Sequence, residues 1–250
     1  MDRFIRSIEV SLENGKMISA IKRAWRRQRY RRHGLVVEAA VPIEEHGSGI
    51  GAWAVTPDGL SAESVVYSFG VGRDLSFDLS LVRRFGCSVH CFDPTPTSAQ
   101  WVKAQTLPPH IVFHELGLAH CDGVLAFHPP RKRTSAHFTP VKRYRDDAEA
   151  GTVQAPVQRL ATILRSLGHD RLDLLKVDIE GGEYEALRDM LASGVPVRQL
   201  LVEFHHCYST IPLARTVEAV NALRRAGFRI FSISPRTYEI SFIRGLTGTP

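Results

Sequence analysis

The sequence predicts an α/β protein built on a doubly wound, mostly parallel sheet that ends in an antiparallel C-terminal hairpin. Strand-like and helix-like stretches alternate from residue 64 onward. The stretch 172–177 is almost continuously apolar, as a strand buried on both faces of a parallel sheet must be. The last two strand-like stretches, 228–234 and 238–243, are joined by a short Ser-Pro-Arg turn, so they must pair antiparallel. This hairpin predicts a reversed strand at the edge of the sheet.

The first half of the sheet alternates regularly between strands and helices. The expected elements are strands at 64–69, 88–92 and 110–114, with helices at 76–85 and 97–105 between them. Ser76 is a reasonable N-cap for the first helix, and Gly86 is expected to end it. A polar, hairpin-like stretch at 117–130 follows.

The second half begins after a polar segment, 128–152, which contains basic groups at 131–133 and 143–145. We expect this segment to form either a mobile loop or a lid over a substrate. The elements expected beyond it are helices at 160–167, 182–192 and 214–226, alternating with strands at 172–177 and 199–204.

The composition indicates one globular domain. The chain has 250 residues, of which 44% are hydrophobic and 23% charged. We expect a domain at 53–250, preceded by an N-terminal extension at 1–52. The four cysteines are scattered and form no CxxC pair, so neither a zinc knuckle nor a disulfide framework is indicated. Because no apolar run approaches a membrane span and the N-terminus lacks a secretory core, we expect a cytoplasmic protein.

The positive charge is concentrated in the N-terminal extension. The formal net charge is +6, yet residues 22–32 alone hold seven Lys or Arg and no Asp or Glu. Ile18, Ile21 and Trp25 recur at helical spacing, which predicts a short basic amphipathic helix. Either this helix packs Ile21 and Trp25 on the domain, or it contacts anionic lipid, nucleic acid or an acidic partner.

A glycine turn, Phe69-Gly70-Val71-Gly72, joins the first strand to its helix. Ligands of open α/β sheets sit beyond the carboxyl ends of the strands, and glycines let a cofactor approach the backbone closely. Asp93 lies 21 residues beyond Gly72, after the next strand, where a carboxylate can accept hydrogen bonds from ribose hydroxyls. Its alternative role, with Pro94, is to start the helix near Thr97.

The same turn narrows the class of cofactor. The dinucleotide fingerprint GxGxxG needs a third glycine where this chain has Leu75, which disfavours a dehydrogenase. No GxxxxGK[ST] segment occurs, which disfavours a P-loop nucleotide hydrolase more strongly.

The most distinctive segment runs from Leu174 to Glu183, where a buried strand opens into three carboxylates. Asp178 and Glu180 would lie on the same side of a continuing strand and face one pocket, whereas Glu183 suits a helix N-terminus. The next strand ends near His205, a candidate general base. These residues include hard and borderline metal ligands, but no spacing demands a metal, and we expect none.

Together these segments resemble the FkbM-type methyltransferase family, and most closely its methyltransferase-domain 21 and 24-like branch. The matching segments are 66–72 with 74 and 76–78, then 90–94, then Leu175-Lys-Val-Asp-Ile-Glu-Gly-Gly-Glu183. The resemblance covers roughly residues 53–242. It implies a class I methyltransferase (Rossmann-like) fold, S-adenosyl-L-methionine as cofactor, and O-methylation of sugar-like or natural-product hydroxyls.

The resemblance also implies site residues by position. The cofactor-binding residues would be Ser68, Phe69, Gly70, Val71, Gly72, Asp93, Pro94, Leu116, Leu118 and Asp178. The glycine turn would wrap the methionine portion, Asp93 would hold the ribose, and residues 115–118 would flank the adenine. Asp178, Glu180 and His205 are the catalytic candidates. Many class I enzymes carry an acidic residue where this chain has Ser68, so a backbone carbonyl or Asp178 would recognise the cofactor's amino group.

Two other classes of function stay open. The basic segment 22–32 would suit an RNA-binding or RNA-modifying protein, although few aromatic residues are interleaved with its charges. Alternatively, the chain is a non-catalytic module that keeps the fold and docks through this helix. The acceptor of an enzyme would be a small molecule with a hydroxyl group, and the sequence leaves the oligomeric state open.

Overall fold

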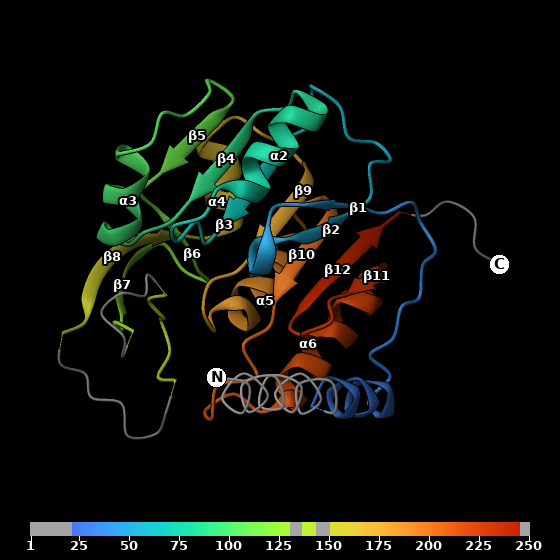
Figure 1. Ribbon diagram of the computed structural model, residues 1–250. Helices are drawn as coiled ribbons and strands as arrows, with labels where there is room; N and C mark the ends of the chain where they lie inside the picture. The colour runs from blue at the N-terminus through green and yellow to red at the C-terminus, as the bar shows by residue number, and fades with distance from the viewer. Residues whose placement is uncertain (1–21, 131–136, 144–150, 246–250) are drawn as a thin grey trace, which may run out of the picture.

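The computed structural model describes residues 22–130, 137–143 and 151–245. Its centre is a seven-stranded sheet with strand order β11-β12-β10-β9-β3-β4-β5 (Figure 1). The strands are β3 (Val66–Phe69), β4 (Val89–Phe92), β5 (Ile111–His114), β9 (Leu172–Val177), β10 (Val197–Glu203), β11 (Phe228–Ile233) and β12 (Glu239–Arg244). β3, β4, β5, β9 and β10 pair in parallel, and the order reverses between β3 and β9. The predicted doubly wound α/β class is confirmed.

The reversed strand, β12, lies inside the sheet and not at its edge, so that part of the expectation is wrong. β12 pairs antiparallel with both β10 and β11. After β10 the chain passes through a helix to β11, which forms the edge of the sheet. The hairpin then brings β12 back between β11 and β10. The outer edge of β11 is covered by the N-terminal extension, because the N–H groups of Glu38 and Ala39 both donate to the carbonyl of Ile230.

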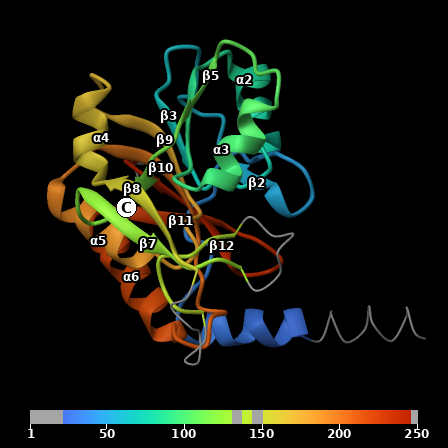
Figure 2. The same ribbon diagram turned by 90° about the vertical axis from the view of Figure 1, so that its left-hand side faces the viewer.

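Helices cover both faces of the sheet (Figures 1 and 2). They are α2 (Ser76–Phe85), α3 (Pro96–Lys103), α4 (Leu160–Ser166), α5 (Glu183–Ser193) and α6 (Leu213–Arg225). Leu81 of α2 and Val102 of α3 belong to one buried cluster. Ile163 of α4, Leu187 of α5 and Val220 of α6 belong to another, on the opposite face. Two apolar layers therefore enclose the sheet, as its buried parallel strands require.

The helix α2 has the bounds that the sequence predicts, but its N-terminus is capped differently. Ser76 is already the first helical residue, and Leu75 occupies the N-cap position without a side-chain hydrogen bond. The carboxylate of Asp74 accepts a hydrogen bond from the Ser76 N–H at 2.8 Å and so supplies the missing acceptor. Gly86 ends the helix in the left-handed conformation, as expected.

A small second sheet corrects the expected hairpin at 117–130. Its strands, β6 (Gly117–Leu118), β7 (Gly123–Phe127) and β8 (Val153–Gln158), lie in the order β6-β8-β7. β6 and β7 therefore pair with β8 and not with each other. The sequence gives little sign of β8, because Pro156 interrupts it and proline is tolerated in a strand only where no backbone donor is needed. Pro156 lies opposite Val124 of β7, but β6 pairs only with Val157 and Gln158, so no strand pairs with Pro156 on the β6 side.

The last part of the N-terminal extension contains regular structure. β1 (Glu44–His46) and β2 (Trp53–Val55) form an antiparallel pair, with the 3₁₀ turn η1 (Gly49–Gly51) between them. Trp53 is buried against α2, where its ring meets that of Phe77 edge-on.

The basic segment forms a helix over residues 22–32. Trp25 is 63% exposed, so the alternative in which it packs on the domain is wrong. Tyr30 is the buried residue, and its hydroxyl is hydrogen-bonded to His206 at 3.2 Å. Ile18 and Ile21 lie outside the described residues. No helix in the described part of the chain has the length and apolar character needed to cross a membrane.

Candidate active site

One large cavity opens beyond the carboxyl ends of β3, β4, β9 and β10. It has a volume of about 810 Å³ and lies at the point where the strand order reverses. The predicted site residues that line it are Phe69, Gly70, Val71, Gly72, Asp93, Pro94, Leu118, Asp178, Glu180 and His205. The fold therefore brings most of the candidates together around one space.

Ser68 and Leu116 are not among the residues that line the cavity. Ser68 is buried within β3, and its side chain lies beside the carboxylate of Asp78 in α2. Leu116 is partly buried and packs against the core. Neighbouring residues of a strand point to opposite faces, so Ser68 points away from the face of the sheet that Phe69 occupies.

The glycine turn packs tightly against the loop that carries Asp178. Gly70 has φ 87°, and a Cβ at this position would lie 1.7 Å from the backbone oxygen of Asp178. Gly72 also has positive φ, at 55°, but a Cβ there would meet nothing within 4 Å. Gly70 thus allows two loops to touch, whereas Gly72 leaves open space beside the cavity.

The carboxylate of Asp93 ties the glycine turn to the start of α3. Its Oδ2 accepts a hydrogen bond from the Gly72 N–H at 2.9 Å. Its Oδ1 accepts from the Thr95 N–H and hydroxyl at 2.9 and 2.6 Å. Thr95 is the N-cap of α3, so Asp93 supports the helix start as well as the cavity wall. A carboxylate offers about four acceptor positions, so one position on Oδ2 stays open for a ligand.

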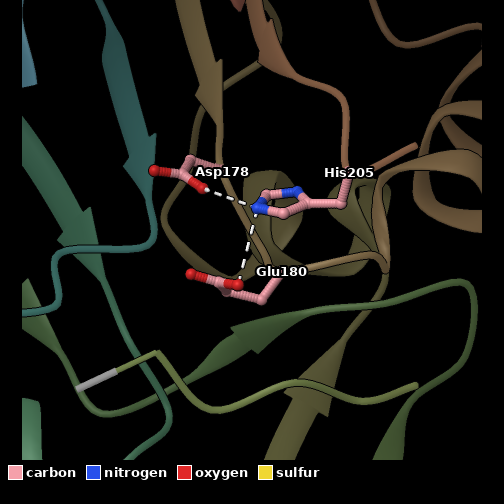
Figure 3. Close-up of side chains that lie close together, drawn as sticks. All are labelled: Asp178, Glu180 and His205. Atoms are coloured by element: carbon pink, nitrogen blue, oxygen red, sulfur yellow. Dashed lines mark ion pairs between the residues drawn. The ribbon is translucent and has the colours of Figure 1, made fainter. Parts of the chain in front are cut away.

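Asp178, Glu180 and His205 form a carboxylate–histidine cluster at the other side of the cavity (Figure 3). Asp178 follows β9, Glu180 lies in the next turn, and His205 follows β10. Nε2 of His205 lies 3.9 Å from Oδ1 of Asp178 and 3.5 Å from Oε2 of Glu180. The three candidates that the sequence placed on two strand ends therefore converge.

Glu183 holds His205, and with it this cluster, in place. Its side chain is completely buried, and its Oε1 pairs with Nδ1 of His205 at 2.9 Å. The same carboxylate accepts hydrogen bonds from the N–H groups of Ile179 and Gly181. Burial alone would lower the pKa of His205, but Glu183 and the other carboxylates raise it well above its ordinary value. Glu183 thus holds the loop and the imidazole together, a role that its position at a helix start did not reveal.

Glu180 is held in an unusual backbone conformation and is surrounded by donors. Its φ is 54°, in the left-handed region. Oε1 pairs with Nδ1 of His137 at 2.6 Å, Oε2 accepts a hydrogen bond from the hydroxyl of Tyr208, and Arg143 lies 3.4 Å away. Burial alone would raise the pKa of Glu180, but His137, His205 and Tyr208 together lower it to about 2.

Asp178 is the more open carboxylate of the pair. Its side chain is 26% exposed, against 15% for Glu180. Burial raises the pKa of Asp178, and the positive charges of Lys176 and His205 only partly offset this effect. Lys176 lies 3.9 Å from Oδ2 of Asp178 and donates to the carbonyls of Phe69 and Gly70 at 3.3 Å.

Several residues at the cavity were not singled out from the sequence. Lys176 carried a readable signal, because a lysine within an otherwise apolar buried strand needs a partner. Arg143 belongs to a basic group that stands out in the sequence, but nothing there links it to Glu180. His137 and Tyr208 carried no signal, since they come from segments far from Glu180 in the chain. Residues 137–143 belong to the polar segment 128–152 and line the cavity in part. The basic residues Arg131, Lys132, Arg133 and Arg145 lie outside the described residues.

Comparison with known proteins gives one family match and two curated relatives. A family model described as a methyltransferase domain matches residues 21–244. The probable methyltransferase-like protein 24 of Homo sapiens is 29% identical over 146 residues, which cover 56% of this chain and 32% of that protein. The protein of the same name from Rattus norvegicus is 27% identical over 180 residues, covering 66% of this chain and 42% of that one. The chain thus spans less than half the length of these relatives.

Two solved structures show a distant likeness. The fibrillarin pre-rRNA processing protein of Methanococcus jannaschii has a TM-score of 0.42 and 8% sequence identity, covering 74% of this chain and 67% of that chain. A fibrillarin/Nop5p complex has a TM-score of 0.40 and 10% identity, covering 74% and 75%.

Proposed function

The chain belongs to the methyltransferase-domain family, with S-adenosyl-L-methionine as methyl donor, and from this premise we propose that it methylates a hydroxyl group of a sugar-like or natural-product small molecule. The observation that carries the proposal is the carboxylate–histidine cluster, which faces the glycine turn across one cavity. A hydroxyl acceptor needs a group that takes its proton, and this cluster offers such groups where the two strand ends meet.

The cavity fits the cofactor in size and in its lining. Pockets of about 300 to 1,000 Å³ hold ligands of this class, and this cavity measures about 810 Å³. The glycine turn would hold the methionine portion, Asp93 would accept from the ribose at Oδ2, and Leu118 with Pro94 would flank the adenine. When bound, the cofactor supplies a methyl group activated by its sulfonium.

Asp178 is the proposed proton acceptor because its carboxylate is the least engaged of the three groups. Both oxygens of Glu180 are occupied, by His137 on one side and by Tyr208 and Arg143 on the other. Nδ1 of His205 is occupied by Glu183. Asp178 combines exposure to the cavity with a loop position fixed against Gly70. Alignment of the acceptor is the other main task of the site, because it replaces an improbable encounter with a held geometry.

The proposal extends to the branch of the family and to the compartment. The segment from Leu175 to Glu183 supports an FkbM-type enzyme of the methyltransferase-domain 21 and 24-like branch. The four cysteines, Cys87, Cys91, Cys121 and Cys207, are free thiols, which fits the reducing cytoplasm.

Two measurements test the proposed function. A thermal shift with S-adenosylhomocysteine is expected to raise the unfolding temperature, since a ligand that binds only the folded state stabilises it. Transfer of labelled methyl groups to a panel of hydroxylated small molecules is then expected for at least one acceptor class. Binding without transfer to any of them would favour a non-catalytic module instead.

An RNA-binding function is the second candidate, because the helix at 22–32 presents its charges to solvent. Trp25 is 63% exposed, and almost every Lys and Arg of this helix is exposed as well. A double variant, Arg27→Glu with Arg31→Glu, leaves Tyr30 in place and reverses two charges on this surface. If the helix binds RNA, the variant binds it more weakly and with a smaller salt dependence. Equal RNA binding by both proteins would remove this candidate.

A further inference from the structure

We propose that Asp178, Glu180 and His205 form a binding site for a divalent transition-metal cation at the acceptor side of the cavity. One donor atom from each residue lies within 4.8 Å of the other two. Nε2 of His205 is 3.5 and 3.9 Å from the carboxylate oxygens, longer than the roughly 2.7–3.2 Å of a direct N–H···O hydrogen bond. Metal–ligand bonds of about 2.0–2.2 Å place neighbouring donor atoms roughly 3 to 3.5 Å apart, so the three donor atoms, which now lie within 4.8 Å of one another, would draw closer together around a cation.

Neighbouring charged side chains orient the three proposed ligands, as they commonly do at protein metal sites. In each residue of the cluster, the polar atom that points away from the other two has a partner of its own. Such partners fix the ring or carboxylate orientation and are a regular feature of protein metal sites. The partners are Glu183 for Nδ1 of His205, His137 for Oε1 of Glu180, and Lys176 for Oδ2 of Asp178. Oε2 of Glu180, which faces the cluster, also accepts a hydrogen bond from Tyr208 and lies 3.4 Å from Arg143, so a cation would compete with these two groups for it.

The donor set indicates the kind of cation. Ca²⁺ and Mg²⁺ prefer oxygen ligands alone, whereas imidazole together with carboxylates suits Mn²⁺, Fe²⁺ or Zn²⁺. Three protein ligands also leave coordination positions open, as in metal sites that act on a substrate. Here the open side would face the cavity, which the exposed part of Asp178 borders.

The sequence alone argued against a metal, and the reason lies in the chain path. Asp178 and Glu180 are two residues apart, but the third ligand follows a different strand, and no short motif links them. Parallel pairing of β9 with β10 brings Val177 opposite Val202, so the segments that follow the two strands leave the sheet side by side. The proposed metal ligands therefore come together because of the register in which β9 and β10 pair.

The inference deepens the proposed function and rests on it for the cation's role in catalysis. A cation held by Oδ1 of Asp178 would bind the acceptor's oxygen, orient it and favour loss of its proton to Oδ2, the other oxygen of the same carboxylate. The cation site itself can be tested without any methyl transfer.

The test is Mn²⁺ binding by the full chain, followed by electron paramagnetic resonance, in which free Mn²⁺ loses its signal on binding. We expect one saturable site per chain. Asp178→Asn, Glu180→Gln and His205→Gln are each expected to weaken binding at least tenfold. Glu183→Gln removes no ligand but releases the imidazole, and is expected to weaken binding by about 10- to 100-fold. The matched control is Glu185→Gln, which removes a carboxylate that lines the same cavity outside the cluster and is expected to bind Mn²⁺ like the wild type.

Absence of saturable Mn²⁺ binding in the wild type would overturn the proposal, whether or not every variant folds. So would unchanged binding in the folded ligand variants, because the metal would then lie elsewhere, for example on surface histidines. Thermal unfolding identifies the variants that fold. If chelator-treated protein still transfers methyl groups and the protein binds no Mn²⁺, the metal-site proposal is wrong and the proposed function stands. If the protein binds Mn²⁺ at this site but transfers no methyl group to any acceptor, the proposed function is wrong and the metal site stands.

Discussion

The two sides of the cavity are built by different means. On the cofactor side, the glycine turn and Asp93 are fixed by backbone N–H groups within short loops, such as the bond from Gly72 to Oδ2 of Asp93. On the acceptor side, the carboxylate–histidine cluster is fixed by side chains that meet from distant segments. His137 and Tyr208 reach Glu180 from positions 43 residues before and 28 residues after it in the chain.

The two sides of the cavity are therefore expected to tolerate different kinds of substitution. A backbone-built wall depends on the conformations that its glycines allow, so its weak points are additions of side-chain atoms. A side-chain-built wall depends on charge balance, so its weak points are removals of a charge or a donor. Substitutions on the two sides are therefore expected to affect different observables, with stability and cofactor affinity on one side and turnover on the other.

The largest expected effect is on turnover at the acceptor side. Asp178→Asn keeps the shape of the side chain but removes the proton acceptor, which typically contributes 10²- to 10⁴-fold to the rate. We expect turnover to fall by about that factor, while affinity for S-adenosylhomocysteine stays within a few-fold. Steady-state kinetics and calorimetry measure the two quantities.

Glu185→Gln is the control for this substitution, because it also neutralises a cavity carboxylate but lies outside the cluster. Unchanged turnover in Asp178→Asn would show that Asp178 is not the proton acceptor. A parallel loss of cofactor affinity would erase the distinction between the two sides.

The next effect is on stability at the cofactor side. Gly70→Ala would place a Cβ 1.7 Å from the Asp178 oxygen, at a φ of 87° that alanine also disfavours. A backbone clash of this kind is expected to cost about 3 to 5 kcal/mol. At about 2–4 °C per kcal/mol for a domain of this size, the unfolding temperature should fall by roughly 10 °C.

Gly72→Ala provides a matched comparison for Gly70→Ala. Its φ of 55° is also positive, but no atom lies within 4 Å of the added Cβ. The expected cost is the left-handed backbone penalty alone, about 1–2 kcal/mol. Equal unfolding temperatures for the two variants in calorimetry would contradict the close contact between the glycine turn and the Asp178 loop.

A smaller effect is expected on cofactor affinity. Asp93→Ala removes a proposed ribose acceptor and also releases Gly72 and Thr95. Charged hydrogen bonds contribute about 1.5–3 kcal/mol, so S-adenosylhomocysteine should bind roughly 10- to 100-fold more weakly. Calorimetry measures this affinity, with the exposed Asp170→Ala as control. If Asp93→Ala and the wild type bind equally well, Asp93 serves only the start of α3.

The sequence predicted the fold well where periodicity and apolar runs are decisive. The bounds of β9 and α2 match the expected ranges, because a buried strand and an amphipathic helix leave clear patterns. β8 was missed because Pro156 argues against a strand. The place of β12 inside the sheet was missed because a hairpin's short turn fixes its direction but not its neighbours.

The candidate site was predictable to a similar degree. Asp178, Glu180 and His205 stand out because charged residues follow apolar strands, and the strand ends of a parallel sheet share one edge. The basic group that holds Arg143 stood out in the sequence, but its contact with Glu180 did not. His137 and Tyr208 could not be predicted, since only the folded chain brings these segments to Glu180. Trp25 was misjudged because helical spacing shows which residues share a face but not what that face meets.

The smallest effect concerns β4, the strand that leads to Asp93 on the cofactor side, where acid is expected to weaken the fold. His90 of β4 packs against His114 and His169, and burial together with these neighbours lowers its pKa to about 4. In the unfolded chain the pKa of a histidine is about 6.5, so the unfolded state takes up the proton first. The stability that neutral His90 contributes is therefore complete above pH 6.5 and is lost as the pH falls toward 4. We expect the urea midpoint to fall over this range, and to fall less in His90→Gln, which cannot be protonated. The same fall in both proteins would assign the acid sensitivity to other groups.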